Sequence, residues 1–170
     1  MNRRSTLSIS AMTTLALALL PTSSIAQQKS LKEQLVGTWT AVSTVNTSTN
    51  GTKSEPFGPN PKGLLIFESN GRFSLITVRP DLPKFGTNNR ATGTADENKA
   101  VLQGSIAYFG TYSVNEADKS YTVQIEGATF PNWAGTTQRR GLSISGDELT
   151  FINAAGSAGG SNEVKYKRIK

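Results

Sequence analysis

The sequence predicts an all-β protein, an eight-stranded antiparallel barrel with one short inserted helix. Eight segments alternate apolar and polar residues with the period of two that a half-buried strand requires. Most of these segments follow one another across short turns, as in a series of hairpins. Eight strands can close into a barrel whose interior is filled or holds one small ligand. A two-sheet sandwich is the alternative architecture for the same strands.

The first expected strand, residues 36–45, contains Gly37 and places Trp39 and Ala41 on one side of the pleat. Gly37 lets the backbone bend tightly into this strand. The clearest hairpin turn is Ser69-Asn70-Gly71, because Asn-Gly is a strong turn sequence. Residues 46–60 are rich in turn formers and are expected to form an irregular loop. The other expected strands are 64–67, with both faces covered, and 72–79, 105–114, 120–130, 137–145, 149–153 and 164–169.

Two segments are expected to be helical. Residues 31–35 form a short helical lead-in to the first strand. Thr94 and Glu97 have the spacing of a capping box, a hydroxyl three residues before a carboxylate, and predict the inserted helix over residues 94–104. This helix lies between the third and fourth strands. The Gly, Ala and Ser residues of 154–161 predict a flexible hairpin loop.

Residues 1–26 have the organisation of a secretory signal peptide, with basic Arg3 and Arg4, an apolar run, and a small residue at the expected cleavage site, Ala26. The apolar run is too short to cross a bilayer, so no transmembrane segment is expected. We therefore expect two parts, the signal peptide and a barrel domain over residues 27–170, and an exported protein, periplasmic or extracellular. The paired arginines leave twin-arginine export open beside the general secretory route.

The composition limits the chemistry. The chain contains no Cys and no His, which excludes Ser-His-Asp and Cys-His catalysis, imidazole and thiolate metal sites, and disulfides. The acidic residues lie mostly at turns and offer no paired carboxylates for general acid–base catalysis. We therefore expect no catalytic residues, no metal and no cofactor.

The net charge is +6 and falls to +4 when Arg3 and Arg4 leave with the signal peptide. Much of the remaining excess lies at the C-terminus, in Lys165, Lys167, Arg168 and Lys170. A nucleic-acid surface has a broader basic stripe with interleaved aromatic residues. The charge pattern is typical of a solvated strand face, and no nucleic-acid partner is expected.

Several segments resemble the lipocalin-like domain family of bacteria and fungi. They are the tripeptide Gly37-Thr38-Trp39 and residues 57–67, 79–85, 97–100, 104–112 and 126–133. The resemblance implies an eight-stranded calycin-type barrel, in which Trp39 packs against an Arg from the end of the last strand, here Arg168. The genes of some fungal relatives lie beside biosynthetic genes, so the resemblance also implies a cyclase or isomerase role as an alternative for this family. The long insert over residues 80–104 departs from typical lipocalins, so the resemblance does not determine the shape of the barrel mouth.

Six residues are candidates for ligand binding. Arg79 continues the apolar face of the third strand, and Arg140 shares a face with Leu142 and Ile144. If these faces are interior, both guanidinium groups approach the barrel mouth. The aromatic candidates lie on the fourth strand or flank a loop, and the full set is Arg79, Tyr108, Tyr112, Phe130, Trp133 and Arg140. In the alternative interpretation, Arg79 pairs with Asp81 or a loop carbonyl and the tyrosines belong to the core.

An apolar cup with cationic and phenolic groups suits an amphiphile that bears a carboxylate or similar anion. The sequence therefore favours an exported binding protein or carrier for a small hydrophobic, anionic ligand. One alternative is an isomerase or cyclase that uses Tyr and Arg as hydrogen-bond donors in the same cavity. Another is a packed barrel without a ligand. The identity of the ligand and the oligomeric state are not determined by the sequence.

Export gives the first testable prediction. The protein recovered after export should be soluble and begin at Gln27, because a small residue at Ala26 fits the cleavage site of a signal peptide. Intact mass spectrometry of the exported protein measures this directly. A mass that still includes residues 1–26 would contradict the prediction.

Overall fold

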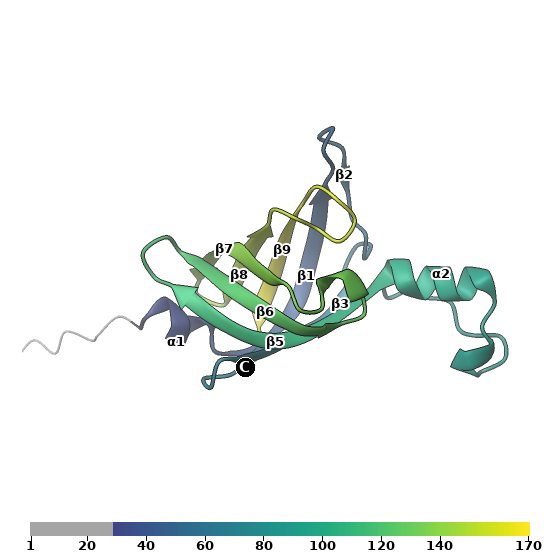
Figure 1. Ribbon diagram of the computed structural model, residues 1–170, viewed down its shortest axis with the longest axis horizontal. Helices are drawn as coiled ribbons and strands as arrows, with labels where there is room; N and C mark the ends of the chain where they lie inside the picture. The colour runs from purple at the N-terminus through teal and green to yellow at the C-terminus, as the bar shows by residue number, and fades with distance from the viewer. Residues whose placement is uncertain (1–28) are drawn as a thin grey trace, which may run out of the picture.

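The computed structural model describes residues 29–170 as a closed antiparallel barrel, and the expected signal peptide lies outside the described residues. Strand β1 pairs with β3 on one side and with β9 on the other, so the sheet closes on itself (Figure 1). The predicted eight-stranded antiparallel barrel is confirmed, and the sandwich alternative is excluded. The barrel strands are β1 (Gly37–Thr47), β3 (Lys62–Phe67), β4 (Arg72–Val78), β5 (Ser105–Asn115), β6 (Ser120–Ala128), β7 (Thr137–Ser145), β8 (Glu148–Asn153) and β9 (Ser161–Arg168).

A ninth strand, β2 (Lys53–Ser54), is an addition to the barrel. It pairs with the end of β1, where Asn46 lies opposite Ser54. The expectation of an irregular loop beginning at residue 46 was therefore wrong. The turn sequence Asn50-Gly51, with Gly51 at a φ of +84°, reverses the chain closely enough for a short ribbon to form.

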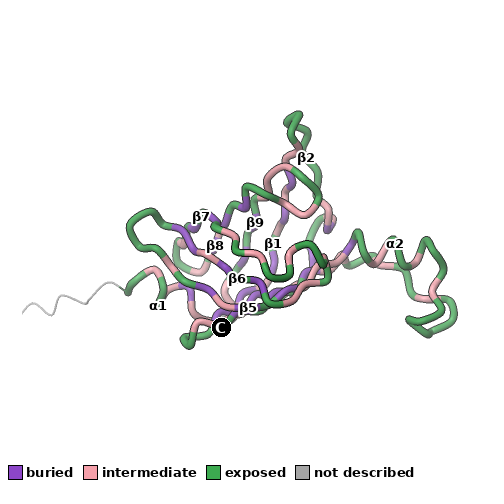
Figure 2. Tube along the Cα trace, in the orientation of Figure 1, coloured by how far each residue is buried: buried purple, intermediate pink, exposed green. Residues whose placement is uncertain are grey.

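The strands bury their inward-facing residues and leave the others near solvent, as Figure 2 shows along the chain. In β3, Leu65 and Phe67 are buried whereas Leu64 is 41% exposed. The prediction that this strand is covered on both faces was wrong, because a closed barrel covers only its inner face. The core is one contiguous cluster that includes aromatic residues from several strands, among them Phe67, Tyr121 and Tyr166.

Two β-bulges change which residues face inward. The first lies in β1 between Ala41 and Ser43, and beyond it Thr44 and Asn46 are buried. The second lies in β6, where consecutive residues Phe109 and Gly110 of β5 pair with Gly127 and Ile125. It leaves Glu126 on the outer surface, where the carboxylate accepts two hydrogen bonds from Arg72.

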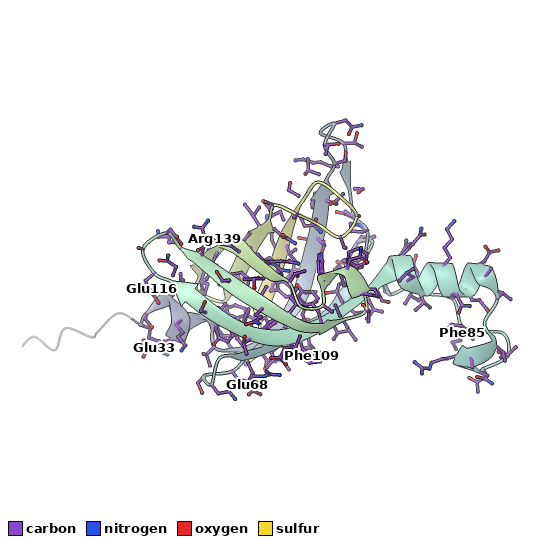
Figure 3. All side chains as sticks on the ribbon, viewed as in Figure 1. Glu33, Glu68, Phe85, Phe109, Glu116 and Arg139 are labelled. Atoms are coloured by element: carbon purple, nitrogen blue, oxygen red, sulfur yellow. The ribbon has the colours of Figure 1, made fainter. Side chains whose placement is uncertain are left out.

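The short helix α1 (Leu31–Leu35) covers one end of the barrel and contacts β5 and β7. Its first turn is capped twice: Ser30 and Glu33 form a capping box, and the Glu116 carboxylate accepts from the backbone N–H of Leu31 and Lys32 at 2.8 and 3.0 Å. Leu35, the last residue of the helix, is fully buried. Figure 3 shows Glu33 and Glu116 at this end. We call it the floor.

The insert between β4 and β5 projects away from the barrel at the opposite end (Figure 1). It contains the 3-10 turn η1 (Arg90–Thr92) and helix α2 (Ala95–Gly104). The predicted capping box is confirmed, since Thr94 Oγ1 accepts from the Glu97 N–H and the Glu97 carboxylate accepts from the Thr94 N–H. Within residues 29–170, no helix has the length and apolar character needed to cross a bilayer.

At the floor, Trp39 and Arg168 join the first and last strands. Trp39 is fully buried and its Nε1 donates to the carbonyl of Leu35 at 2.9 Å. The Arg168 guanidinium lies 4.0 Å from the centre of the Trp39 rings and donates to the carbonyls of Val36 and Gln34. Gly37 has a φ of +132°, and a Cβ there would lie 2.8 Å from Arg168 Nη1. Only glycine leaves room for this arrangement.

Replacing Trp39 by Ala should lower the free energy of unfolding by about 3–5 kcal/mol, the range for deleting a large buried aromatic side chain. Urea denaturation of the variant and the unmodified protein measures the difference. Ile152→Ala is a matched control, because Ile152 is 51% exposed on the outer face and its loss should cost little. A loss below about 1 kcal/mol for Trp39→Ala would show that Trp39 is not a core residue.

Candidate functional site

The core stops short of the barrel end opposite the floor, and an inner chamber remains there. Aromatic side chains form part of its walls, with Tyr108, Trp133, Phe151 and Tyr166 among them. Thr44, Asn153 and Asn162 give one side a polar character, and Arg140 supplies a charge. A chamber with apolar walls and a few polar groups is the usual form of a small-molecule site.

Arg140 is the most unusual residue of the inner chamber. Strand alternation turns Arg139 outward, where it pairs with Asp118 at 2.7 Å, and turns Arg140 inward, where it is 2% exposed. Arg140 Nη1 donates to the Tyr108 hydroxyl at 2.6 Å and Nη2 donates to Gln138 Oε1 at 2.7 Å. Its Nε is buried without a hydrogen-bond partner. One donor of a charged group that lines the chamber is therefore unused.

The charge of Arg140 also lacks an acidic partner. Among residues 29–170, each ion pair involves another cation. The rings of Tyr108, Trp133 and Phe151 lie 5.2, 5.7 and 5.7 Å from its guanidinium carbon, close enough for cation–π attraction. Rings and neutral oxygens compensate only part of the cost of taking a charge out of water. An anion in the chamber would supply the rest.

Two tyrosines of this region stay protonated well into the alkaline range. Burial raises the pKa of Tyr121 and of Tyr166, because a phenolate is poorly solvated in the barrel interior. Tyr166 lines the inner chamber, and Tyr121 of β6 is paired with Arg140 on the neighbouring strand β7. At neutral pH both hydroxyls are therefore neutral groups that can donate a hydrogen bond.

A wider outer hollow opens beside the inner chamber, and Arg79 and Phe130 line it. Arg79 donates to both oxygens of Asp81 at 3.0 and 2.8 Å, and these hydrogen bonds hold the pKa of Asp81 below its usual range. Its side chain is 41% exposed. The structure thus shows the alternative in which Arg79 pairs with Asp81, and it separates the two arginines that the sequence placed together at the mouth.

Tyr112 lies in neither space. Its hydroxyl donates to the carbonyl of Glu68 at 2.8 Å, and its ring packs edge-on against Phe67 with centres 4.8 Å apart. Both partners belong to the floor half of the barrel. The structure therefore places Tyr112 in the core, whereas Tyr108 and Trp133, whose rings lie 5.3 Å apart, share the inner chamber with Arg140.

Sequence reasoning missed a layer of interior amides. Asn46, Asn162 and Asn153 occupy neighbouring positions on β1, β9 and β8. With its amide turned to donate, Asn46 bonds Asn162 Oδ1 at 2.9 Å, and Asn153 Oδ1 accepts from the Ala155 N–H at 3.1 Å. The second bond anchors the start of the tract expected to be a flexible loop. The β1 bulge that turns Asn46 inward has no signal in the sequence.

Phe57 was also missed, although a signal was present. It is an isolated aromatic residue in a loop otherwise dominated by polar and turn-forming residues, and it is 8% exposed. It lines both the inner chamber and the outer hollow. Within the part of the chain that the structure describes, no three acidic side chains gather closely enough to hold a metal ion.

The chain belongs to the lipocalin-like domain family, whose model matches residues 36–166. It is 30% identical over 82 residues to a 4′-hydroxy-3′-methoxypropiophenone carrier protein of Aspergillus oryzae, a match covering 45% of this chain and 74% of that protein. Among solved structures, a lipocalin-like protein from Bacteroides uniformis matches 79% of this chain and 98% of its own, at 14% identity and a TM-score of 0.43. A redesigned β-barrel matches 82% and 95%, at 16% identity and a TM-score of 0.42.

The buried tyrosines predict how stability depends on pH. The pKa of Tyr121 and Tyr166 is higher in the folded protein than in the unfolded chain, so their contribution is present below about pH 10 and is lost as pH rises above it. Tyrosinate absorbance and circular dichroism should be followed together. Part of the tyrosinate signal should appear only as the fold is lost. Full ionisation of the chain's 4 tyrosines near pH 10 with the fold intact would contradict this.

Proposed function

We propose that this chain is a binding protein or carrier for a small hydrophobic molecule with an anionic group, held in the barrel by Arg140. The observation that carries the proposal is the buried guanidinium with an unpaired Nε and no acidic partner among residues 29–170. A carboxylate or phenolate on the ligand would accept from the guanidinium and neutralise its charge. The surrounding rings would pack against the carbon atom next to that group.

The similarity to a fungal carrier protein supports this role. That relative is named for carrying a small aromatic ketone with a phenolic hydroxyl, a molecule that combines a ring with hydrogen-bonding oxygens. The cationic donor of the inner chamber and the apolar side chains of the outer hollow beside it fit a cargo of the same general character. We also propose that the protein acts after export, in the periplasm or outside the cell, because residues 1–26 have the organisation of a signal peptide.

One observation favours a second candidate, an isomerase or cyclase. Arg140 donates to the Tyr108 hydroxyl at 2.6 Å, and a cation beside a phenol stabilises negative charge that develops on it or on a substrate oxygen held nearby. Mass spectrometry of a bound ligand after long incubation separates the two roles. A carrier returns the ligand unchanged, whereas an enzyme returns an isomer or a cyclised product.

Arg140→Met should weaken binding of octanoate about tenfold or more, because a hydrogen bond to a charged group contributes about 1.5–3 kcal/mol. Octanol, which lacks the charge, should bind the unmodified protein more weakly than octanoate by a similar factor. Titrations followed by tryptophan fluorescence, with calorimetry as a check, measure both effects. Trp133 is a suitable reporter because it lines the inner chamber.

Arg79→Met is the matched control. It removes the same group from the outer hollow, where Arg79 is already paired with Asp81, so octanoate affinity should change less than in Arg140→Met. Equal affinity of all three proteins for octanoate would refute the anion site. Absence of binding by any medium-chain carboxylate would favour the packed barrel without a ligand.

A further inference from the structure

The inner chamber and the outer hollow are two compartments of one site. Phe57, Ile106 and Ser157 line both spaces, and we call these three residues the neck. They come from the loop before β3, from the start of β5 and from the loop between β8 and β9. The two spaces therefore adjoin at these three residues.

The two compartments differ greatly in size. About 40 Å³ of the inner chamber is open to the centres of water molecules, compared with about 490 Å³ in the outer hollow. A single water needs about 10–15 Å³ on this scale, so the inner chamber holds roughly three water-sized groups. This is enough for a carboxylate and its adjoining carbon. The hydrophobic part of an amphiphile does not fit there and has to lie beyond the neck.

The outer hollow offers the apolar surface that such a body needs. Pro56, Leu102 and Phe130 line it together with two of the neck residues, Phe57 and Ile106. Leu102 is 65% exposed near the end of α2, close to where the projecting insert rejoins the barrel at β5. Covering this side chain with an apolar ligand would remove it from water, which is favourable in proportion to the area buried.

Phe57 is placed to decide what crosses the neck. It is 8% exposed, yet it is absent from the contiguous cluster that forms the barrel core. A tight turn presents it, in which the Gly58 N–H donates to the Glu55 carbonyl at 2.9 Å and Gly58 has a φ of +66°. Phe57 is therefore buried outside that cluster, and truncating it removes no member of the core.

We propose that the ligand spans both compartments, with a compact oxyanion at Arg140, an unbranched or flat segment in the neck, and an apolar body in the outer hollow. The inference rests on the proposed function and narrows the ligand class. Straight-chain and flat carboxylates beyond a minimum length are accepted, and carboxylates with a quaternary carbon at the third position, the first carbon that lies in the neck, are rejected. Phe57 is the residue that sets this selection.

Chain length provides the first test. Affinity of the purified protein should be low for acetate and butanoate, which end in the inner chamber or the neck. It should then rise through hexanoate and octanoate by about fourfold for each methylene buried in the outer hollow. An affinity that does not increase with chain length would show that the body of the ligand does not lie in the outer hollow.

A branched ligand provides the second test. The unmodified protein should bind 3,3-dimethyloctanoate, whose branched carbon lies in the neck, at least about tenfold more weakly than octanoate, and Phe57→Ala should reduce this difference to about threefold or less, because the clash at the neck is removed. Phe130→Ala is the matched control, an aromatic truncation in the outer hollow away from the neck. Phe130→Ala should weaken the binding of both ligands and leave the ratio of their affinities unchanged. Thermal unfolding verifies that both variants remain folded.

The outcomes separate this inference from the proposed function. If octanoate binds and depends on Arg140, but Phe57→Ala leaves the ratio of the two affinities unchanged, the spanning arrangement is wrong and the carrier role stands. Equal binding of the two ligands by the unmodified protein leads to the same conclusion. If the unmodified protein binds no carboxylate, both proposals fail.

Discussion

The pairing of β1 with β9 is the contact on which the rest of the structure depends, because it turns a series of hairpins into a closed barrel. Trp39 and Arg168 secure this seam at the floor: the guanidinium stacks on the indole and donates to two carbonyls at the end of α1. Closure removes the exposed sheet edges and fixes an inside for every strand. Without this pairing, the barrel would be open between β1 and β9, and neither the core nor the inner chamber would be enclosed.

The barrel uses two arginines in opposite ways. Arg168 has an aromatic face and two carbonyl acceptors, and its role is complete without any other molecule. Arg140 is more deeply buried and yet retains an unused donor and an uncompensated charge. A buried charge of this kind opposes stability, and an apolar residue of similar size would cost the fold less. A residue that is kept although it lowers the stability of the fold is typical of a functional site.

The site also divides labour between rigid and adaptable parts. The barrel strands β7, β5 and β8 carry Arg140, Tyr108 and Phe151, so the position of the ligand's head group is fixed by the sheet. Phe57 and Ser157 belong to loops, and Leu102 belongs to the projecting insert. A rigid anion site behind a neck formed partly by loops lets one barrel hold its charge in place while it admits ligands with bodies of different shape.

The sequence alone was enough to predict the number and order of the barrel strands and the capped helix after Thr94, because alternation, capping and turn sequences act over a few residues. The contact between Trp39 and Arg168 was predicted through the family resemblance. It also named Arg140, Tyr108 and Trp133, which share the inner chamber. The tertiary structure was needed to separate Arg79 from Arg140 and to place Tyr112 in the core. It also brought Phe57 to the site and turned Asn46 inward, where it bonds Asn162 of the chamber wall. A bulge, a loop's path and the depth of a side chain depend on contacts between distant strands, and alternation along one strand carries no record of them.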